Sequence, residues 1–358
     1  MKARTWIITL PSVWLTLALV CAGGAQESDE LRHRGFAGFG YREVTGEDVA
    51  AMSLPDTAGV VVTTVLPGSA AERAGLQEGD ILQAFDDRPV ADVSSFLGMA
   101  RSYYAGDQAV FGLVRGGERL SLPITFGASL ETSEEVEVEY TSFTNREGIR
   151  LRAVVTSPIG SGTQRLPALL VVSALGSPRL IDAPRYNMRR QIAHTLSKAG
   201  IRVMRFELRG YGDSEGEDFK TTDLTTEVDD NLDALDYLAG RDDVDPVRVF
   251  VMGHSTAGFV AAQLAGQREL AGAIEEPVLI VYAASDFLTQ LACHEHIADL
   301  LTAAGNEDVT LAVIEDLDHN FAHAADKAAS FEHYRTRAFE ANPAPIARIQ
   351  AWLSERTR

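Results

Sequence analysis

The sequence has few basic residues for its length. Its 358 residues include 32 Lys and Arg against 51 Asp and Glu, so the formal net charge is −19 at pH 7. Nucleic-acid binding depends on Lys and Arg contacts to phosphate, and anionic membrane surfaces repel a protein of this charge. We therefore expect no nucleic-acid partner.

Cysteine is almost absent, and no metal-binding pattern stands out. Cys293 is the only cysteine outside the N-terminal apolar run, so an internal disulfide is not expected. The histidines in 294–296 lack the i, i+4 spacing of a zinc helix, and His319 with His323 has no supporting carboxylate motif. We predict neither a metal nor a cofactor.

A long apolar run lies at the N-terminus. Lys2 and Arg4 precede residues 6–21, which are mostly apolar, and the small residues 22–25 follow. This order is typical of a secretory signal peptide, and it predicts cleavage after Ala25 and a secreted or periplasmic protein. The alternative is a lipoprotein attached through Cys21, which the bulky Val20 before it disfavours.

The segment that follows carries a series of strand and turn signals. A β-branched strand at 60–65 precedes a Pro67-Gly68 turn, a short helix that Gly75 ends, a turn at Gly79 and a strand that leads into a hairpin near 86–90. Residues 35–127 resemble a PDZ domain of the kind found in periplasmic trypsin-like proteases.

The PDZ resemblance implies that an extended peptide adds as a strand to a sheet edge, with backbone N–H groups holding its terminal carboxylate. The matching loop contains Phe36, Ala37, Gly38 and Phe39, and the facing helix is expected near 94–103. Protein C-termini are the partners that this predicts. The alternative is a PDZ domain that only packs against the rest of the chain.

Beyond an expected acidic linker at 128–135, three polar residues each follow a strand-like apolar run. Ser255 lies in a strand, turn and helix at 249–264, Asp286 comes four residues after a strand at 278–282, and His319 comes five after a strand at 311–314. The carboxyl ends of parallel strands share one edge of a sheet, so these three can converge. A serine hydroxyl needs an imidazole and a carboxylate to become a nucleophile. The spacing predicts a Ser255–His319–Asp286 triad.

A second motif supports a family resemblance. Residues 207–216 are similar to the Asp-x-Arg-Gly-x-Gly-x-Ser loop of the bacterial serine esterases and serine aminopeptidase-like members of the α/β-hydrolase superfamily, with Glu207 in place of Asp. The resemblance covers residues 136–358. It implies an α/β fold with a mostly parallel sheet and helices on both faces, and an oxyanion hole made by the N–H of Thr256 with that of Leu175 or Gly176.

Two departures from the family pattern leave the function open. Ala257 stands where the nucleophile motif has Gly, and an expected strand at 270–274 is separated from the next by too few residues for a crossover helix or a lid. We expect a hydrolase of carboxylic esters, and a serine aminopeptidase or a catalytically impaired scaffold that binds C-termini are the alternatives. The substrate would be a small-molecule ester or a peptide, and the PDZ domain could cover the cleft in place of the lid.

Overall fold

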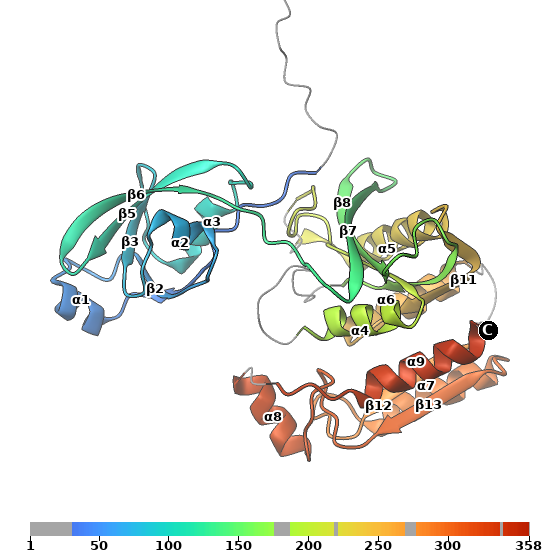
Figure 1. Cartoon of the computed structure of the whole chain (residues 1–358). Coiled ribbons are helices and arrows are strands. Elements are labelled where there is room, and N and C mark those ends of the chain that lie inside the picture. The colour runs from blue at the N-terminus through green and yellow to red at the C-terminus, as the bar shows by residue number, and fades with distance from the viewer. Residues whose placement is uncertain (1–30, 175–186, 218–220, 269–276, 337–338, 358) are drawn as a thin grey trace, which may run out of the picture. The chain divides into compact units, whose positions relative to one another are not determined.

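The computed structural model describes residues 31–174, 187–217, 221–268, 277–336 and 339–357 (Figure 1). The N-terminal apolar run and the oxyanion candidates Leu175 and Gly176 lie outside these ranges. No helix among the described residues is long and apolar enough to cross a membrane.

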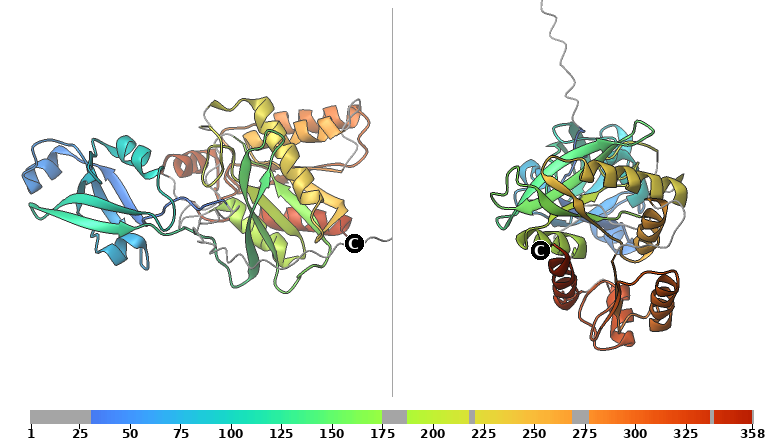
Figure 2. Two further views of the ribbon diagram at one scale, coloured as in Figure 1. Left: turned by 90° about the horizontal axis from the view of Figure 1, so that it is seen from above. Right: turned by 90° about the vertical axis from the view of Figure 1, so that its right-hand side faces the viewer.

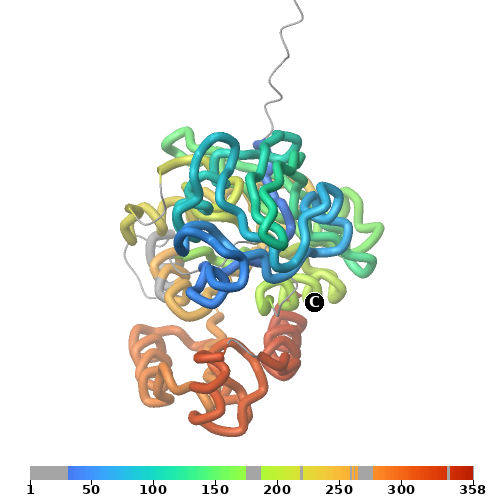
Figure 3. Tube along the Cα trace, turned by 90° about the vertical axis from the view of Figure 1, so that its left-hand side faces the viewer, coloured from blue at the N-terminus to red at the C-terminus, as the bar shows by residue number. Residues whose placement is uncertain are grey.

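The first folded segment is an antiparallel sheet with three short helices. Its strands follow the order β1 (Phe39–Glu43), β2 (Val60–Val65), β3 (Ile81–Phe85), β5 (Gln108–Arg115) and β6 (Glu118–Thr125), and β4 (Arg88–Pro89) pairs with β3. The helices are α1 (Gly46–Met52), α2 (Ala70–Ala74) and α3 (Val93–Ala100). Phe36 pairs with Gly127, so the chain enters and leaves this segment side by side. Figure 3 shows the trace of this segment in blue to blue-green.

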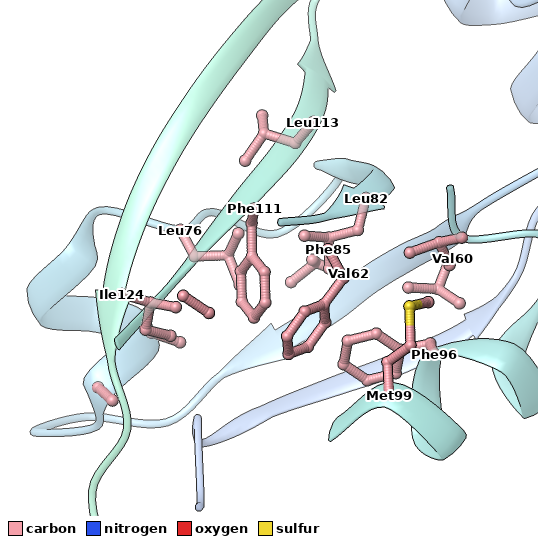
Figure 4. Packing of buried hydrophobic residues seen from close by; sticks show 14 of the residues in the cluster. Val60, Val62, Leu76, Leu82, Phe85, Phe96, Met99, Phe111, Leu113 and Ile124 are labelled. Atoms are coloured by element: carbon pink, nitrogen blue, oxygen red, sulfur yellow. The ribbon is translucent and has the colours of Figure 1, made fainter. Parts of the chain in front are cut away.

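Aromatic rings fill the core of this segment (Figure 4). Phe85 and Phe111 are fully buried and their ring centroids lie 5.0 Å apart, and Phe96 of α3 packs against both. Phe96 also contacts Tyr41 of the edge strand β1. The helix expected at 94–103 is therefore present as α3, which ends three residues earlier and packs next to β1.

The second segment contains two sheets. In the larger sheet, β7 (Val136–Thr144) and β8 (Arg150–Pro158) form an antiparallel hairpin. The strand order is β11-β9-β10-β8-β7, and β9 (Leu166–Val171), β10 (Arg202–Phe206) and β11 (Val244–Met252) are parallel. A separate parallel pair joins β12 (Val278–Ala283) to β13 (Val309–Ile314). The strand expected at 270–274 lies outside the described residues.

Helices cover both faces of the larger sheet (Figures 1 and 2). Side chains alternate along β9, so that Leu169 faces α4 (Met188–Lys198) and α9 (Ala344–Arg356), whereas Leu170 faces α5 (Leu224–Ala239). The remaining helices are α6 (Thr256–Arg268), α7 (Leu291–Ala303) and α8 (Lys327–Thr336). The predicted fold class, a mostly parallel sheet with helices on both faces, is confirmed.

The expected acidic linker contains one residue that is not exposed. Glu131 is buried, and its carboxylate accepts two hydrogen bonds from the fully buried Arg205, at 2.9 and 3.0 Å, and lies 2.7 Å from His194 Nε2. Burial raises the pKa of Glu131, but His194 and Arg205 outweigh burial and lower the pKa to about 2. Within the expected acidic linker, Glu131 thus supplies the anion that the buried Arg205 guanidinium needs.

We expect Arg205→Met to lower the free energy of unfolding by about 3–5 kcal/mol, because it leaves the Glu131 carboxylate buried without its main partner. Lys198→Met removes an exposed pair with Glu135 and should cost less than about 1 kcal/mol. Urea unfolding of both variants measures the difference. Equal losses in the two variants would contradict the prediction.

Folding lowers the pKa of Glu131 from 4.5, so the stabilising effect of this carboxylate is present above that pH and is lost as the pH falls towards 2.

Candidate active site

The turn between β11 and α6 presents Ser255 at the end of the strand. Ser255 has a φ of 57°, a left-handed conformation that is costly for a residue with a side chain. A Cβ on Gly253 would lie 2.2 Å from the carbonyl oxygen of Ala257, so the turn requires glycine at that position. Ala257 is fully buried and contacts the core between α5 and α6. The structure therefore accommodates the Ala257 departure in a tight strand-to-helix turn.

The three residues predicted to converge do lie together. His319 Nε2 is 3.0 Å from Ser255 Oγ, and His319 Nδ1 is 2.8 Å from Asp286 Oδ2. Asp286 follows β12, His319 follows β13, and Ser255 follows β11, all at the carboxyl ends of their strands. The chain thus forms a continuous hydrogen-bonded line from carboxylate to imidazole to hydroxyl.

Asp286 is buried and accepts several hydrogen bonds. Its Oδ1 accepts from the backbone N–H of Leu288 at 2.7 Å, and its Oδ2 accepts from Thr289 Oγ1 at 2.6 Å. Burial raises the pKa of Asp286, but hydrogen bonds from His319, Thr289 and Leu288 outweigh burial and lower the pKa to about 2. Asp286 is therefore an anion at neutral pH, and it fixes the proton of His319 on Nδ1.

Asp318, the carboxylate directly before His319, has a different role from Asp286. Its Oδ1 accepts hydrogen bonds from the backbone N–H groups of Asn320 and Ala322, both at 2.8 Å, and its Oδ2 lies 3.3 Å from His333 Nδ1. The tight loop around His319 needs an internal acceptor for its N–H groups, and the buried Asp318 supplies one.

His254, the residue before Ser255, contacts the same loop from the other side. Its Nε2 lies 2.6 Å from the carbonyl oxygen of His319, and its ring packs edge-on against Phe321. Removal from water lowers the pKa of His254 to about 4, so the ring is neutral at pH 7 and Nε2–H donates to that carbonyl. No strand pairing joins β11 to β12 in the described part of the chain. This hydrogen bond therefore ties the Ser255 turn to the His319 loop across two separate sheets.

We expect His254→Phe to lower kcat for p-nitrophenyl acetate about tenfold and to leave KM within about twofold, because phenylalanine keeps the ring packing and removes one hydrogen bond to the His319 loop. His254→Gln supplies an amide donor and should recover most of kcat. Steady-state kinetics of the two variants tests this. A Phe variant with unchanged kcat, or a Gln variant as slow as the Phe variant, would rule out the hydrogen bond as the cause.

Of the predicted oxyanion donors, only Thr256 lies among the described residues. It is the first residue of α6, directly after Ser255, and its role as a donor stays a prediction.

Side-chain hydrogen bonds fix the end of β9, just before residues 175 and 176. Asn231 of α5 bonds both the N–H and the carbonyl of Ser173, and Ser173 Oγ donates to the carbonyl of Phe206. Asn231 had no signal in the sequence, because an amide within a helix is ordinarily solvated.

The predicted peptide-binding loop lies next to the edge strand β1. The carbonyls of Ala37 and Gly38 accept hydrogen bonds from Ala71 and Leu66, and Gly38 has a φ of 84°. In the described part of the chain, the N–H groups of Ala37 and Gly38 donate to no other group. Phe36 pairs with Gly127, and Phe39 begins β1. The loop therefore offers backbone donors beside an unpaired strand edge.

No group of three or more His, Cys, Asp or Glu side chains within the described ranges is arranged to hold a metal ion.

Curated relatives match a limited part of the chain. A probable periplasmic serine endoprotease, DegP-like, of Chlamydia trachomatis is 27% identical over 154 residues, which are 42% of this chain and 30% of that protein. The periplasmic pH-dependent serine endoprotease DegQ of Escherichia coli is 28% identical over 105 residues, or 29% of this chain and 23% of that protein. The chain thus spans less than a third of the length of these relatives.

Solved structures similar to the chain include an esterase of Rhizomucor miehei, with a TM-score of 0.45, 17% identity and coverage of 63% of this chain and 84% of that chain. Est1E from Butyrivibrio proteoclasticus, solved with ferulic acid, has a TM-score of 0.42, 15% identity and coverage of 55% and 98%.

Family models match both folded segments. The model for the PDZ domain matches residues 35–126, and the model for the alpha/beta hydrolase family matches residues 152–357. The second match covers more than half of the chain, so the protein belongs to the alpha/beta hydrolase family and carries a PDZ domain before its hydrolase domain.

Proposed function

We propose that the protein is a secreted or periplasmic serine hydrolase that cleaves carboxylic esters through a covalent acyl-enzyme. The hydrogen-bonded line from Asp286 through His319 to Ser255, with separations of 2.8 and 3.0 Å, carries this proposal. An acid held ionised, an imidazole oriented by that acid and a hydroxyl on a strained turn are the parts that nucleophilic acyl transfer needs.

The first half of the reaction forms the acyl-enzyme. Ser255 Oγ attacks the ester carbonyl carbon while its proton moves to His319 Nε2, and the tetrahedral oxyanion accepts a hydrogen bond from the N–H of Thr256. The oxyanion then reforms the carbonyl, the bond to the alcohol oxygen breaks, and His319 returns the proton to the departing alcohol. Asp286 stabilises the imidazolium throughout.

The second half hydrolyses the acyl-enzyme. A water molecule loses a proton to His319 Nε2 and attacks the acyl carbon, and the second tetrahedral intermediate expels Ser255 Oγ, which takes the proton back. The product is a carboxylic acid, and the enzyme returns to its starting state. Within the protein, only Ser255 and His319 change protonation, and Asp286 stays ionised throughout.

The PDZ domain would bind protein C-termini beside the hydrolase. The N–H groups of Ala37 and Gly38 would hold a terminal carboxylate, and the peptide would add as a strand to the edge of β1. Calorimetric titration with C-terminal peptides, with the C-terminal amide as control, tests this part. If the free-acid peptide and its C-terminal amide bind with equal affinity, the domain does not recognise the terminal carboxylate.

Labelling with a fluorophosphonate probe tests the nucleophile. The purified protein should be labelled at Ser255, and labelling should require His319. A folded protein that takes no label would contradict the proposal and favour a scaffold that binds C-termini. Turnover of amino-acid amides in place of esters would identify a serine peptidase instead.

A further inference from the structure

Helix α8 lies against both loops that carry the acid and the base of the triad. Phe287 follows Asp286 directly, and its ring contacts Phe331 and Tyr334 of α8, with centroids 5.3 and 5.6 Å apart. On the other loop, His333 of α8 lies 3.3 Å from the Asp318 carboxylate. The helix is therefore held at the catalytic edge of the sheet from two directions.

The outer surface of this contact is apolar and exposed. Phe331 is 50% exposed and Tyr334 42%, although each is a large hydrophobic side chain. Solvent-exposed aromatic rings grouped on one surface mark binding sites more often than stability features. We call Phe287, Phe331 and Tyr334 the aromatic platform.

The contacts of α8 place this platform at the loops that carry the acid and the base of the triad. An acyl chain attached to Ser255 needs an apolar surface near the triad, and the platform begins one residue from Asp286.

We propose that the aromatic platform binds the apolar acyl group of the substrate and makes the enzyme selective for esters of medium-chain or aromatic acids. This inference rests on the proposed ester hydrolase function. Each CH₂ group removed from water contributes about 0.8 kcal/mol, so several CH₂ groups against this platform change kcat/KM by at least tenfold.

The test compares p-nitrophenyl acetate with p-nitrophenyl octanoate. In Phe331→Ala/Tyr334→Ala we expect kcat/KM for the octanoate to fall at least tenfold, while kcat/KM for the acetate stays within about threefold. Leu300→Ala, which removes an exposed leucine of α7, is the matched control and should change neither value. Phe331→Leu keeps an apolar side chain and should retain most of the octanoate activity.

Two outcomes would overturn the inference: equal changes for the two esters in the double variant, or an octanoate preference that survives it. Absence of acetate hydrolysis and of Ser255 labelling in the unaltered protein would instead contradict the proposed function. In that case, calorimetric titration with octanoate still tests the platform, since equal affinity in the unaltered protein and the double variant would refute it.

Discussion

Ser255→Ala should lower kcat for ester hydrolysis by about a millionfold, and His319→Ala should do nearly the same, because each removes one end of the proton transfer at the nucleophile. The two side chains act as a unit, so the double variant should be no slower than the slower single variant. Steady-state kinetics with p-nitrophenyl acetate measures all three. Residual turnover would come from the oxyanion hole and from substrate binding alone.

Ser102→Ala provides the control for this series. Ser102 is an exposed serine of the PDZ domain, and its replacement should leave kcat unchanged. Circular dichroism shows whether each variant stays folded. Ser255→Ala removes only an oxygen from a turn whose shape depends on Gly253, so we expect it to fold like the unaltered protein. Ester hydrolysis that persists in folded Ser255→Ala would show that another residue is the nucleophile.

The elements that could be predicted from the sequence are those with local signals. The turn around Ser255 is encoded by small residues between an apolar strand and a helix, and the structure has a left-handed Ser255 at that turn. Asp286 and His319 could be placed because both follow short apolar strands, and β12 and β13 do pair in parallel. The order of Ser255, Asp286 and His319 in the chain and their positions after parallel strands are together enough to predict that they converge.

The features that could not be predicted depend on partners far away in the sequence. Glu131 looked like one of several linker acids, because nothing in the sequence around it indicates that it pairs with the buried Arg205. His254 bonds the carbonyl of His319, which is 65 residues away in the sequence, and spacing gives no sign of this bond. Helix α8 was not expected, and its position against Phe287 is visible only once the two loops are folded.

Asp286→Asn should lower kcat about ten-thousandfold, and the reason is the direction in which the amide must point. The N–H of Leu288 lies 2.7 Å from Oδ1, so the carbonyl of the new Asn stays on that side and its NH₂ group faces His319 Nδ1. Nδ1 must then accept a hydrogen bond, which moves the imidazole proton to Nε2. A proton on Nε2 prevents His319 from accepting the proton of Ser255.

Asp318→Asn applies the same chemical change one residue from His319 and should behave differently. The Asn carbonyl can still accept from the N–H groups of Asn320 and Ala322, and the NH₂ group faces the ring of His333, which can accept from it as a neutral imidazole. We therefore expect kcat for p-nitrophenyl acetate to stay within about threefold of the unaltered protein. The difference between the two variants, measured at one pH, separates the acid of the triad from an acid that only shapes the loop. Comparable losses of kcat in both variants would mean that kcat depends on the structure of the loop and not on the position of the His319 proton. Only the carboxylate that contacts Nδ1 can change that position.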